Sequence, residues 1–185
     1  MNDISPPDIS PQHIRRAAQG DQAAFRLIVE HHSRAMFRLA FRLTQNEAQA
    51  EEVVQDTFMK VYRKLKDFKQ DSSLRTWIHR ITVNTAMDHL RRKRHLEVAT
   101  ETGELPEVAP EPAGLCAAEQ QEIQERTQKL LQQLSPIERA ALSLRHFEGH
   151  SIREIAHALE LGESACKQAI FRAVKKLRLA LEPWS

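Results

Sequence analysis

Two groups of side chains have the types and the spacing needed to bind nucleic acid, and the first lies between residues 69 and 94. It combines one tryptophan, one asparagine and a series of basic residues: Lys69, Arg75, Trp77, Arg80, Asn84 and Arg91, followed by Arg92, Lys93 and Arg94. Bases of a separated strand stack on aromatic rings and hydrogen-bond through their open edges, while phosphates pair with basic groups. This group therefore indicates single-strand binding. The alternative is that Trp77, at helical spacing, belongs to a helix core.

The second group lies near the carboxyl end, on one expected helix. Its members are polar, basic or protruding: Lys167, Gln168, Phe171, Arg172 and Lys175. Donors in the first half of such a helix reach base edges in a major groove, so we expect Lys167 and Gln168 to contact bases, and Arg172 and Lys175 to contact phosphates. The alternative is a solvated basic face on a structural helix.

The residues before this helix predict a helix-turn-helix. The stretches SPIE at 135–138 and SIRE at 151–154 each have a serine followed three residues later by glutamate, the pattern of a capping box. The first helix should bury Ala141, Leu144 and Phe147. The helices expected here are 137–148, ending at Gly149, a short one from 152 to about 159, and 163–180. A short helix, a turn and a longer basic helix form the plan that places a helix in the major groove.

The amino-terminal half predicts a helical bundle that would position the first group. Apolar residues recur at three- and four-residue steps, and Asp21 is placed to cap the first long helix. The expected helices are 12–19, 21–44, 47–66 and 74–92, with a polar helix over 119–134 farther along. Glycine is scarce, at five residues, and aromatic residues make up 5% of the chain, so composition favours helix over sheet. We therefore expect an all-α protein.

Charge is arranged in blocks that the small net charge of +2 conceals. Residues 14–96 contain 17 Lys and Arg against nine Asp and Glu, a net charge of +8. Residues 97–125 contain eight Glu and neither Lys nor Arg, and residues 126–185 have a net charge of +4. We therefore expect two small helical domains that face polyanions, joined by a flexible acidic linker. The expected boundaries are a disordered tail over 1–11, domains over 12–95 and 119–185, and the linker over 96–118.

Two parts of the chain resemble regions of one protein family. Residues 50–58, AEEVVQDTF, and residues 71–86, DSSLRTWIHRITVNTA, are similar to regions 2.2 to 2.4 of the extracytoplasmic-function sigma factors, in the sigma-70 superfamily. Residues 134–177, with EIA at 154–156 and IFRA at 170–173, resemble region 4 of the same family. The two sets occur in the family's order and at its separation.

The resemblance implies a role in transcription initiation. The family's first domain docks on the β′ clamp helices of core RNA polymerase, and the matching residues here are Glu52, Gln55, Asp56 and Phe58. The first nucleic-acid group would capture the −10 promoter strand, with Asn84 at a flipped base, and the second group would read −35 duplex DNA. The resemblance also implies contact with the β flap, a linker that threads toward the RNA exit channel, and an anti-sigma factor as a partner.

The sequence departs from the family at several positions. Arg75 and His79 stand where aromatic residues often flank the family's tryptophan, so we expect strand capture to depend more on charge. Glu160 stands where the turn often has glycine. Ala169 replaces a basic residue, which removes a phosphate contact, and Gln168 replaces a short hydroxyl with a group that pairs bidentately with adenine. We therefore expect an unusual −35 preference.

Other chemistries have little support in the residue spacing. The sequence has no nucleophilic side chain paired with a general base and no glycine-rich phosphate-binding loop. We therefore expect that the protein is not an enzyme and uses no cofactor or small-molecule substrate. Neither the histidines nor Cys116 and Cys166 give a four-ligand metal spacing, and we expect Cys166 to be buried rather than a redox switch. With no apolar span or signal segment, the protein is expected in the cytoplasm.

Two alternative functions are also compatible with the sequence. One is a stand-alone helix-turn-helix regulator, which would bind duplex operators as a dimer without polymerase. The other is an adaptor that sequesters a partner without touching DNA, which the basic final helix disfavours.

Overall fold

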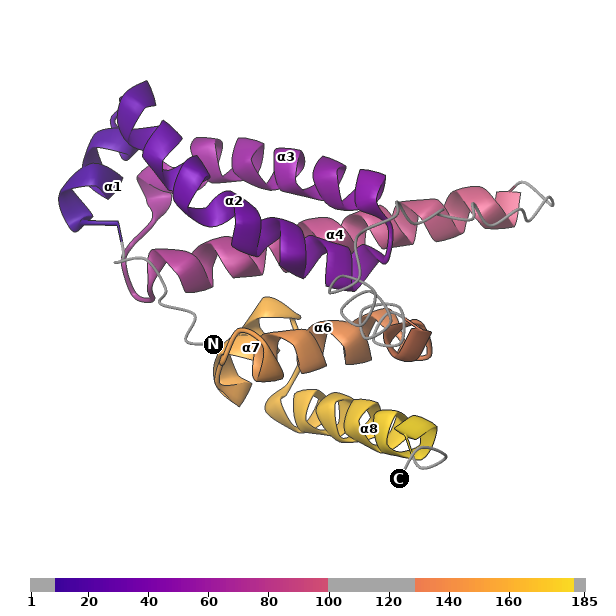
Figure 1. Ribbon diagram of the computed structural model, residues 1–185. Helices are drawn as coiled ribbons and strands as arrows, with labels where there is room; N and C mark the ends of the chain where they lie inside the picture. Colours follow the sequence, from indigo (N-terminus) through magenta and orange to yellow (C-terminus); the bar gives the residue numbers. More distant parts are fainter. Residues whose placement is uncertain (1–8, 100–128, 182–185) are drawn as a thin grey trace, which may run out of the picture.

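The computed structural model describes residues 9–99 and 129–181 of the 185-residue chain, and within these ranges every regular element is a helix (Figure 1). The first bundle contains α1 (Pro11–Ala18), α2 (Gln22–Thr44), α3 (Glu47–Lys64), the 3-10 helix η1 (Leu65–Asp67) and α4 (Leu74–Ala99). The second bundle contains α6 (Pro136–His146), α7 (Ile152–Ala158) and α8 (Glu163–Leu181). The predicted all-α fold is confirmed.

Polar caps determine where the long helices of the first bundle begin. The Asp21 side chain accepts a hydrogen bond from the Ala24 amide at 3.0 Å, as predicted, and Asn46 accepts one from the Gln49 amide at 2.9 Å. Such caps satisfy amides that no carbonyl of the same helix can reach. Between the two helices, Gln45 adopts a left-handed conformation with φ 57°, which ends α2 and reverses the chain.

Both predicted capping boxes are present in the second bundle. The Ser135 amide donates to the Glu138 carboxylate at 3.0 Å, and the Ser151 amide donates to the Glu154 carboxylate at 2.8 Å. In each box the serine hydroxyl accepts the glutamate's own amide in return. These reciprocal bonds fix the starts of α6 and α7 and, through them, the approach to α8.

Helices α2, α3 and α4 of the first bundle run alongside one another around an apolar core, and α1 covers one end (Figure 1). The core includes fully buried side chains from each long helix: Ile28 and Met36 on α2, Val61 on α3 and Ile78 on α4. Burial of side chains of this size contributes about 1.5–3 kcal/mol each. These buried contacts therefore fix the position of α4, which bears the polar residues of the first group.

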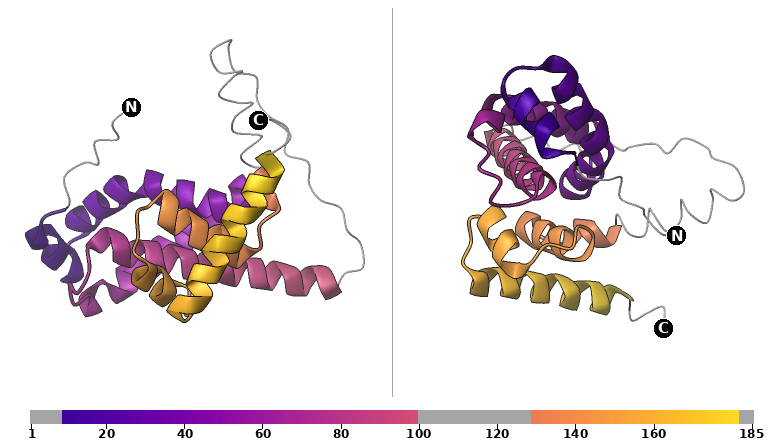
Figure 2. Two further views of the ribbon diagram at one scale, coloured as in Figure 1. Left: turned by 90° about the horizontal axis from the view of Figure 1, so that it is seen from below. Right: turned by 90° about the vertical axis from the view of Figure 1, so that its left-hand side faces the viewer.

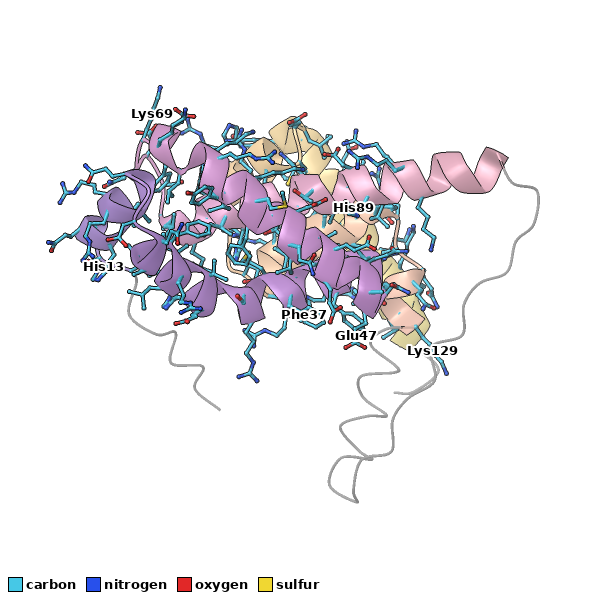
Figure 3. The ribbon with its side chains drawn as sticks, turned by 90° about the horizontal axis from the view of Figure 1, so that it is seen from above. His13, Phe37, Glu47, Lys69, His89 and Lys129 are labelled. Carbon is cyan, nitrogen blue, oxygen red and sulfur yellow. The ribbon has the colours of Figure 1, made fainter. Side chains whose placement is uncertain are left out.

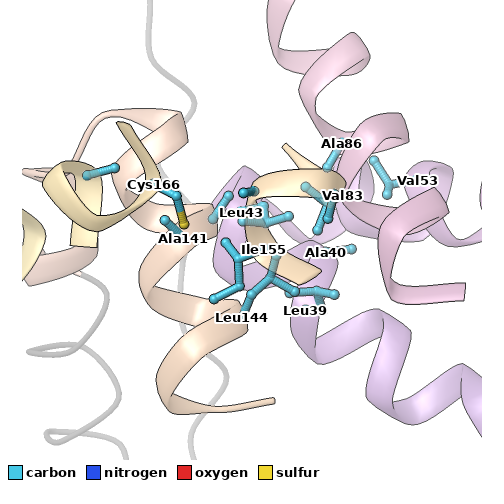
Figure 4. Packing of buried hydrophobic residues seen from close by; sticks show 14 of the residues in the cluster. Leu39, Ala40, Leu43, Val53, Val83, Ala86, Ala141, Leu144, Ile155 and Cys166 are labelled. Carbon is cyan, nitrogen blue, oxygen red and sulfur yellow. The ribbon is translucent and has the colours of Figure 1, made fainter. Parts of the chain in front are cut away.

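The second bundle lies as a separate layer against the first, with α6 and α7 between α4 and α8 (Figure 2). One apolar cluster spans the boundary between the layers and joins Leu39, Leu43 and Val83 of the first bundle to Leu144 and Ile155 of the second (Figure 4). All five side chains are at most 1% exposed. The two bundles therefore share a continuous core in this arrangement.

The structure corrects two expectations about helix extent and burial. Phe147 was expected in the core but is 51% exposed, because α6 ends at His146. The Arg42 guanidinium carbon lies 4.5 Å from the centroid of the Phe147 ring and covers its face. Helix α4 was expected to end near Arg92 but continues to Ala99. Residues 93–99 contain neither proline nor glycine, so nothing in them interrupts a helix.

Several expectations lie partly or wholly outside the described residues. These are the tail over 1–8, the acidic linker from 100 to 118, and most of the helix expected over 119–134, of which residues 129–132 are seen as helix.

Candidate nucleic-acid interface

The predicted strand-binding group follows the loop before α4 and one side of that helix. Arg80, Asn84 and Arg91 are separated by four and seven residues, so they lie along the same side of α4. Arg91 is exposed, whereas Arg80 and Asn84 are half-buried. Lys69 is exposed in the loop, at the far end of the bundle from Glu47 (Figure 3). The structure therefore places Arg80, Asn84 and Arg91 along one side of α4.

Trp77 is held against the core of the first bundle. Its ring packs against Phe68 with centroids 5.0 Å apart, and the side chain is half-buried beside the cluster that contains Ile78 and Leu74. This packing agrees with the alternative interpretation of the sequence, in which Trp77 belongs to a helix core. Part of the side chain remains exposed, and the ring is already oriented by its neighbour.

The basic residues at the start of α4 contact the second bundle. An Arg75 nitrogen donates to Glu148 at 2.9 Å, and an Arg80 nitrogen lies 3.4 Å from the His157 ring. Farther along the helix, Arg91 donates to Asp88 at 3.0 Å. The group expected to bind a strand is thus partly occupied by protein acceptors.

His79 lies on the buried side of α4, where it and Arg75 approach the same carboxylate, that of Glu148. It is 1% exposed, and its Nδ1 lies 2.8 Å from Nε2 of His150. Burial, and then the positive groups around it beginning with His150, lowers the pKa of His79 to about 2. It is therefore neutral near pH 7 and takes no direct part in binding a strand in this arrangement.

Helix α8 presents the second predicted group to solvent. Lys167, Gln168, Arg172 and Lys175 are all exposed, and Phe171 is 69% exposed. The opposite side of α8 is buried through small residues: Cys166, Ala169 and Ala173. Polar and protruding groups therefore face outward together, as a helix that enters a groove requires.

Two predictions about this helix can be judged from burial. Cys166 is buried, as predicted, and burial followed by the nearby Glu163 raises the pKa of its thiol. Ala169 is 1% exposed and packs in the core shared by the bundles. The expected loss of a phosphate contact at Ala169 is wrong, because this position faces the protein interior.

Glu138 is a residue of this surface that the sequence identified only as a cap. Its carboxylate, in a side chain only 6% exposed, accepts from Lys176 at 2.7 Å and from Arg172 at 3.3 Å. Burial opposes ionisation, but hydrogen bonds from Lys176 and Ser135 outweigh it and hold the pKa of Glu138 below its usual value. Glu138 thus fixes two basic side chains of α8 against α6.

The turn before α8 accommodates the departure at Glu160. This residue has φ 55°, the left-handed conformation that glycine adopts most easily, while Gly162 has no positive φ. The chain therefore makes the turn at the position of the family's glycine and bears some backbone strain there.

The residues matched to polymerase binding lie on α3. Glu52 and Gln55 are exposed, whereas Asp56 is held by His89 of α4, whose Nε2 lies 2.8 Å from its carboxylate. Phe58 is 8% exposed within the core of the first bundle, so it supports this face from beneath. His89, which the sequence did not single out, also lies 3.8 Å from Glu52.

The described residues contain no group of three or more His, Cys, Asp or Glu side chains placed to hold a metal ion. Among those same ranges, no helix has both the length and the apolar character needed to cross a bilayer. The geometry of these parts points to binding surfaces: a basic side of α4, an acidic side of α3 and the outward side of α8.

Comparison with protein families and with characterised relatives matches both halves of the chain. The family described as Sigma-70 region 2 matches residues 28–96, and the one described as Sigma-70, region 4 matches residues 124–177. The RNA polymerase sigma-H factor of Pseudomonas aeruginosa is 34% identical over 184 residues, covering 93% of each chain. The ECF RNA polymerase sigma-E factor of Escherichia coli K12 is 32% identical over 181 residues, covering 92% of this chain and 93% of the relative.

Two solved structures have the same arrangement of helices over most of their length. CnrH, in complex with the cytosolic domain of CnrY, has 29% sequence identity and a TM-score of 0.65, covering 94% of this chain and 97% of CnrH. RpoE of Bartonella quintana, in complex with the anti-sigma factor NepR, has 25% identity and a TM-score of 0.72, covering 87% of this chain and 98% of RpoE.

Proposed function

Because the chain belongs to the extracytoplasmic-function group of the sigma-70 family, we propose that its α4 and α8 surfaces direct RNA polymerase to promoters with both −10 and −35 elements. The protein is an RNA polymerase sigma factor. The observation that carries the assignment of surfaces is the separation of two polar sets, a partly exposed one on α4 and an exposed one on α8, each within the matched region of its own bundle.

The α4 surface is assigned to the −10 strand. Arg80 and Arg91 pair with phosphates, while Asn84 donates to and accepts from the edge of a flipped base. Lys69 and Arg75 add basic groups at the loop end, and the exposed part of the Trp77 side chain supports the base. Because Arg75 and His79 replace aromatic residues, phosphate pairing has a larger share in binding than stacking.

The α8 surface is assigned to the −35 duplex. Lys167 and Gln168 lie in the first turns of the helix, where base edges are within reach, and Lys175 lies farther along, where phosphates are. Phe171 supplies an apolar contact of the kind made to thymine methyl groups. Arg172 reaches a phosphate while Glu138 holds its guanidinium in place.

Core polymerase, promoter DNA and an anti-sigma factor are the partners of this function. The exposed Glu52 and Gln55, together with Asp56, bind the β′ clamp helices, and the second bundle contacts the β flap. The solved relatives CnrH and RpoE are seen with the CnrY cytosolic domain and the anti-sigma factor NepR, which supports a comparable antagonist here. The protein acts where core polymerase acts, in the cytoplasm, and binding rather than catalysis is its contribution.

The experiment that tests this function adds the purified chain to core polymerase and a library of promoter fragments. The expected result is initiation from a subset of fragments that share −10 and −35 elements, with duplex binding that is weak for the free chain and much tighter once core is present. Tight duplex binding without core, unaffected by its addition, would instead identify a stand-alone regulator.

A further inference from the structure

The loop between α6 and α7 inserts a buried carboxylate into the basic surface of the first bundle. The Glu148 side chain is 6% exposed, and its two oxygens are paired with Arg42 of α2 and with Arg75 of α4, the latter at 2.9 Å. Its second oxygen also lies 3.6 Å from Nε2 of His79. A carboxylate between two guanidinium groups makes the same contacts that a DNA phosphate would make.

Further polar contacts hold the same loop in place. His150 shares a 2.8 Å hydrogen bond with His79, and the two rings meet edge to face with centroids 5.1 Å apart. On α6, the 8%-exposed Arg139 donates to the carbonyl oxygen of Leu43 at 2.7 Å. These bonds join residues at least 71 positions apart and lie beside the apolar cluster that spans both bundles. The contact thus consists of specific, mostly buried polar side chains.

The contact covers residues assigned to the −10 strand. Arg75 pairs with Glu148, and the Arg80 guanidinium lies 3.4 Å from the His157 ring of α7. A strand that follows α4 toward the preceding loop would have to replace both acceptors. A strand phosphate paired with Arg75 would therefore compete with Glu148 for the same guanidinium.

We propose that Glu148 is an intramolecular competitor of the −10 strand, and that its pairing with Arg42 and Arg75 holds the free protein in an autoinhibited state. The proposal rests on the proposed function, which assigns Arg75 to DNA. Only the open fraction of molecules binds, so the apparent affinity for a strand is the intrinsic affinity multiplied by that fraction. Charge-assisted hydrogen bonds of this kind hold the closed state by roughly tenfold to a hundredfold in population.

The opening can be measured without DNA. In a Cys116→Ser background, single cysteines replace the exposed Arg63 on α3 and Arg178 on α8 and receive a donor and an acceptor dye, while buried Cys166 is protected from labelling. Glu148→Gln should lower the transfer efficiency by separating the bundles. Glu160→Gln, which removes a charge from an exposed position of the same bundle, should leave the efficiency unchanged.

Strand binding is then measured on the same unlabelled variants. The probe is a fluorescein-labelled pool of random single-stranded DNA of about 12 nucleotides, a length within the range that an OB-fold single-strand-binding module covers. Glu148→Gln should bind about tenfold more tightly than the unaltered chain or Glu160→Gln. Arg42→Gln removes the other guanidinium that pairs with Glu148, and Arg42 lies outside the proposed −10 group, so this variant should give the same gain. Arg38→Gln, at an exposed position of α2, should not. Helix content by circular dichroism shows that each variant is folded.

The outcomes separate this proposal from the proposed function. If neither Glu148→Gln nor Arg42→Gln changes the transfer efficiency, the pairing of Glu148 with Arg42 and Arg75 does not hold the bundles together. The proposal is then overturned, and the proposed promoter function is unaffected. If both open the protein without a gain in strand binding, inhibition is overturned. In that second case, Arg80→Gln is measured too. If it binds the strand as tightly as the unaltered chain, the proposed −10 surface is overturned as well.

Discussion

Asn84 is the residue on which the assignment of α4 to the −10 strand depends most. It lies half-buried on the same side of α4 as Arg80, and its amide can both donate to and accept from an extruded base. Asn84→Ala should weaken open-complex formation about tenfold to a hundredfold, since a good base contact contributes about 1–3 kcal/mol. Binding to core polymerase, measured by co-elution, should be unchanged. Equal loss of both activities would show that Asn84 is structural.

The buried histidine pair makes closure of the two bundles depend on pH. His79 is neutral in the closed state because its pKa is lowered to about 2, whereas an exposed histidine has the ordinary value of about 6.5. Its contribution to closure is therefore complete above about pH 6.5 and declines as pH falls toward the closed-state value, by up to about 1.4 kcal/mol per pH unit. The pKa of His150 is lowered too, chiefly by burial, so both rings act in the same direction.

The charges around the pair do not reverse this direction. The groups that face it are Glu148 and Glu154 from the second bundle, Arg75 on α4, and Arg42 and His32 on α2. Transfer efficiency between the two dyes should fall from pH 8 to pH 5 while helix content persists, and His146→Gln, at an exposed position, should not alter the transition. The idea fails if His79→Gln with His150→Gln leaves the transition intact.

At the scale of elements, Glu138 joins α6 to α8. Glu138→Gln removes a buried charge that accepts from Lys176 and Arg172, so the second bundle should lose roughly 1–3 kcal/mol of unfolding free energy. Binding to −35 duplex should weaken as well, because two basic side chains of α8 lose their support. Chemical denaturation and duplex titration measure the two effects. The exposed Glu163→Gln serves as the control, and an unchanged midpoint would remove Glu138 from this role.

Helix α8 also allows phosphate contacts to be separated from base contacts. Lys175 is exposed, so Lys175→Gln should weaken binding to all duplexes about equally and reduce the slope of log affinity against log salt by about 0.9. Gln168→Ala should instead change the preference among −35 sequences with little effect on that slope. Lys129→Gln, exposed before α6, should do neither. A sequence-dependent loss in Lys175→Gln would assign that residue to a base.

The elements themselves could be predicted where a local pattern determines them. The two capping boxes depend on residues three positions apart, and the structure has both, as it has the Asp21 cap. Phe147 was misplaced because helical periodicity assigns it to the inner face of α6, whereas the helix ends one residue earlier. The role of Glu138 beyond its cap depends on α8, more than 30 residues away, and no local pattern carries that information.

At the scale of the whole molecule, the packing of the two bundles could not be predicted from the sequence. Small apolar residues at the interface, such as Ala140 and Ala141, would be expected in the core of their own bundle as readily as between bundles. The polar contacts across the interface join positions far apart in the sequence, such as Glu148 and Arg75. The charge blocks even argue against it, since the segments 14–96 and 126–185 are both positive. The shared apolar core and the paired Glu148 outweigh that repulsion, which solvent and salt screen.

The charge blocks lead to a final prediction about the acidic segment between the bundles. Residues 97–125 contain eight Glu and no basic residue, which suits a path lined with positive charge in the polymerase. Replacing Glu101, Glu104, Glu107 and Glu111 by glutamine should lower transcription by the assembled holoenzyme, because the segment loses attraction to that path. Binding of the free chain to −35 duplex should not weaken, since α8 is unaltered. Equal loss in both assays would contradict a role for the segment inside the polymerase. Loss confined to the holoenzyme would show that the small net charge of +2 combines two positive blocks that bind DNA and one negative block that binds a positive surface of the polymerase.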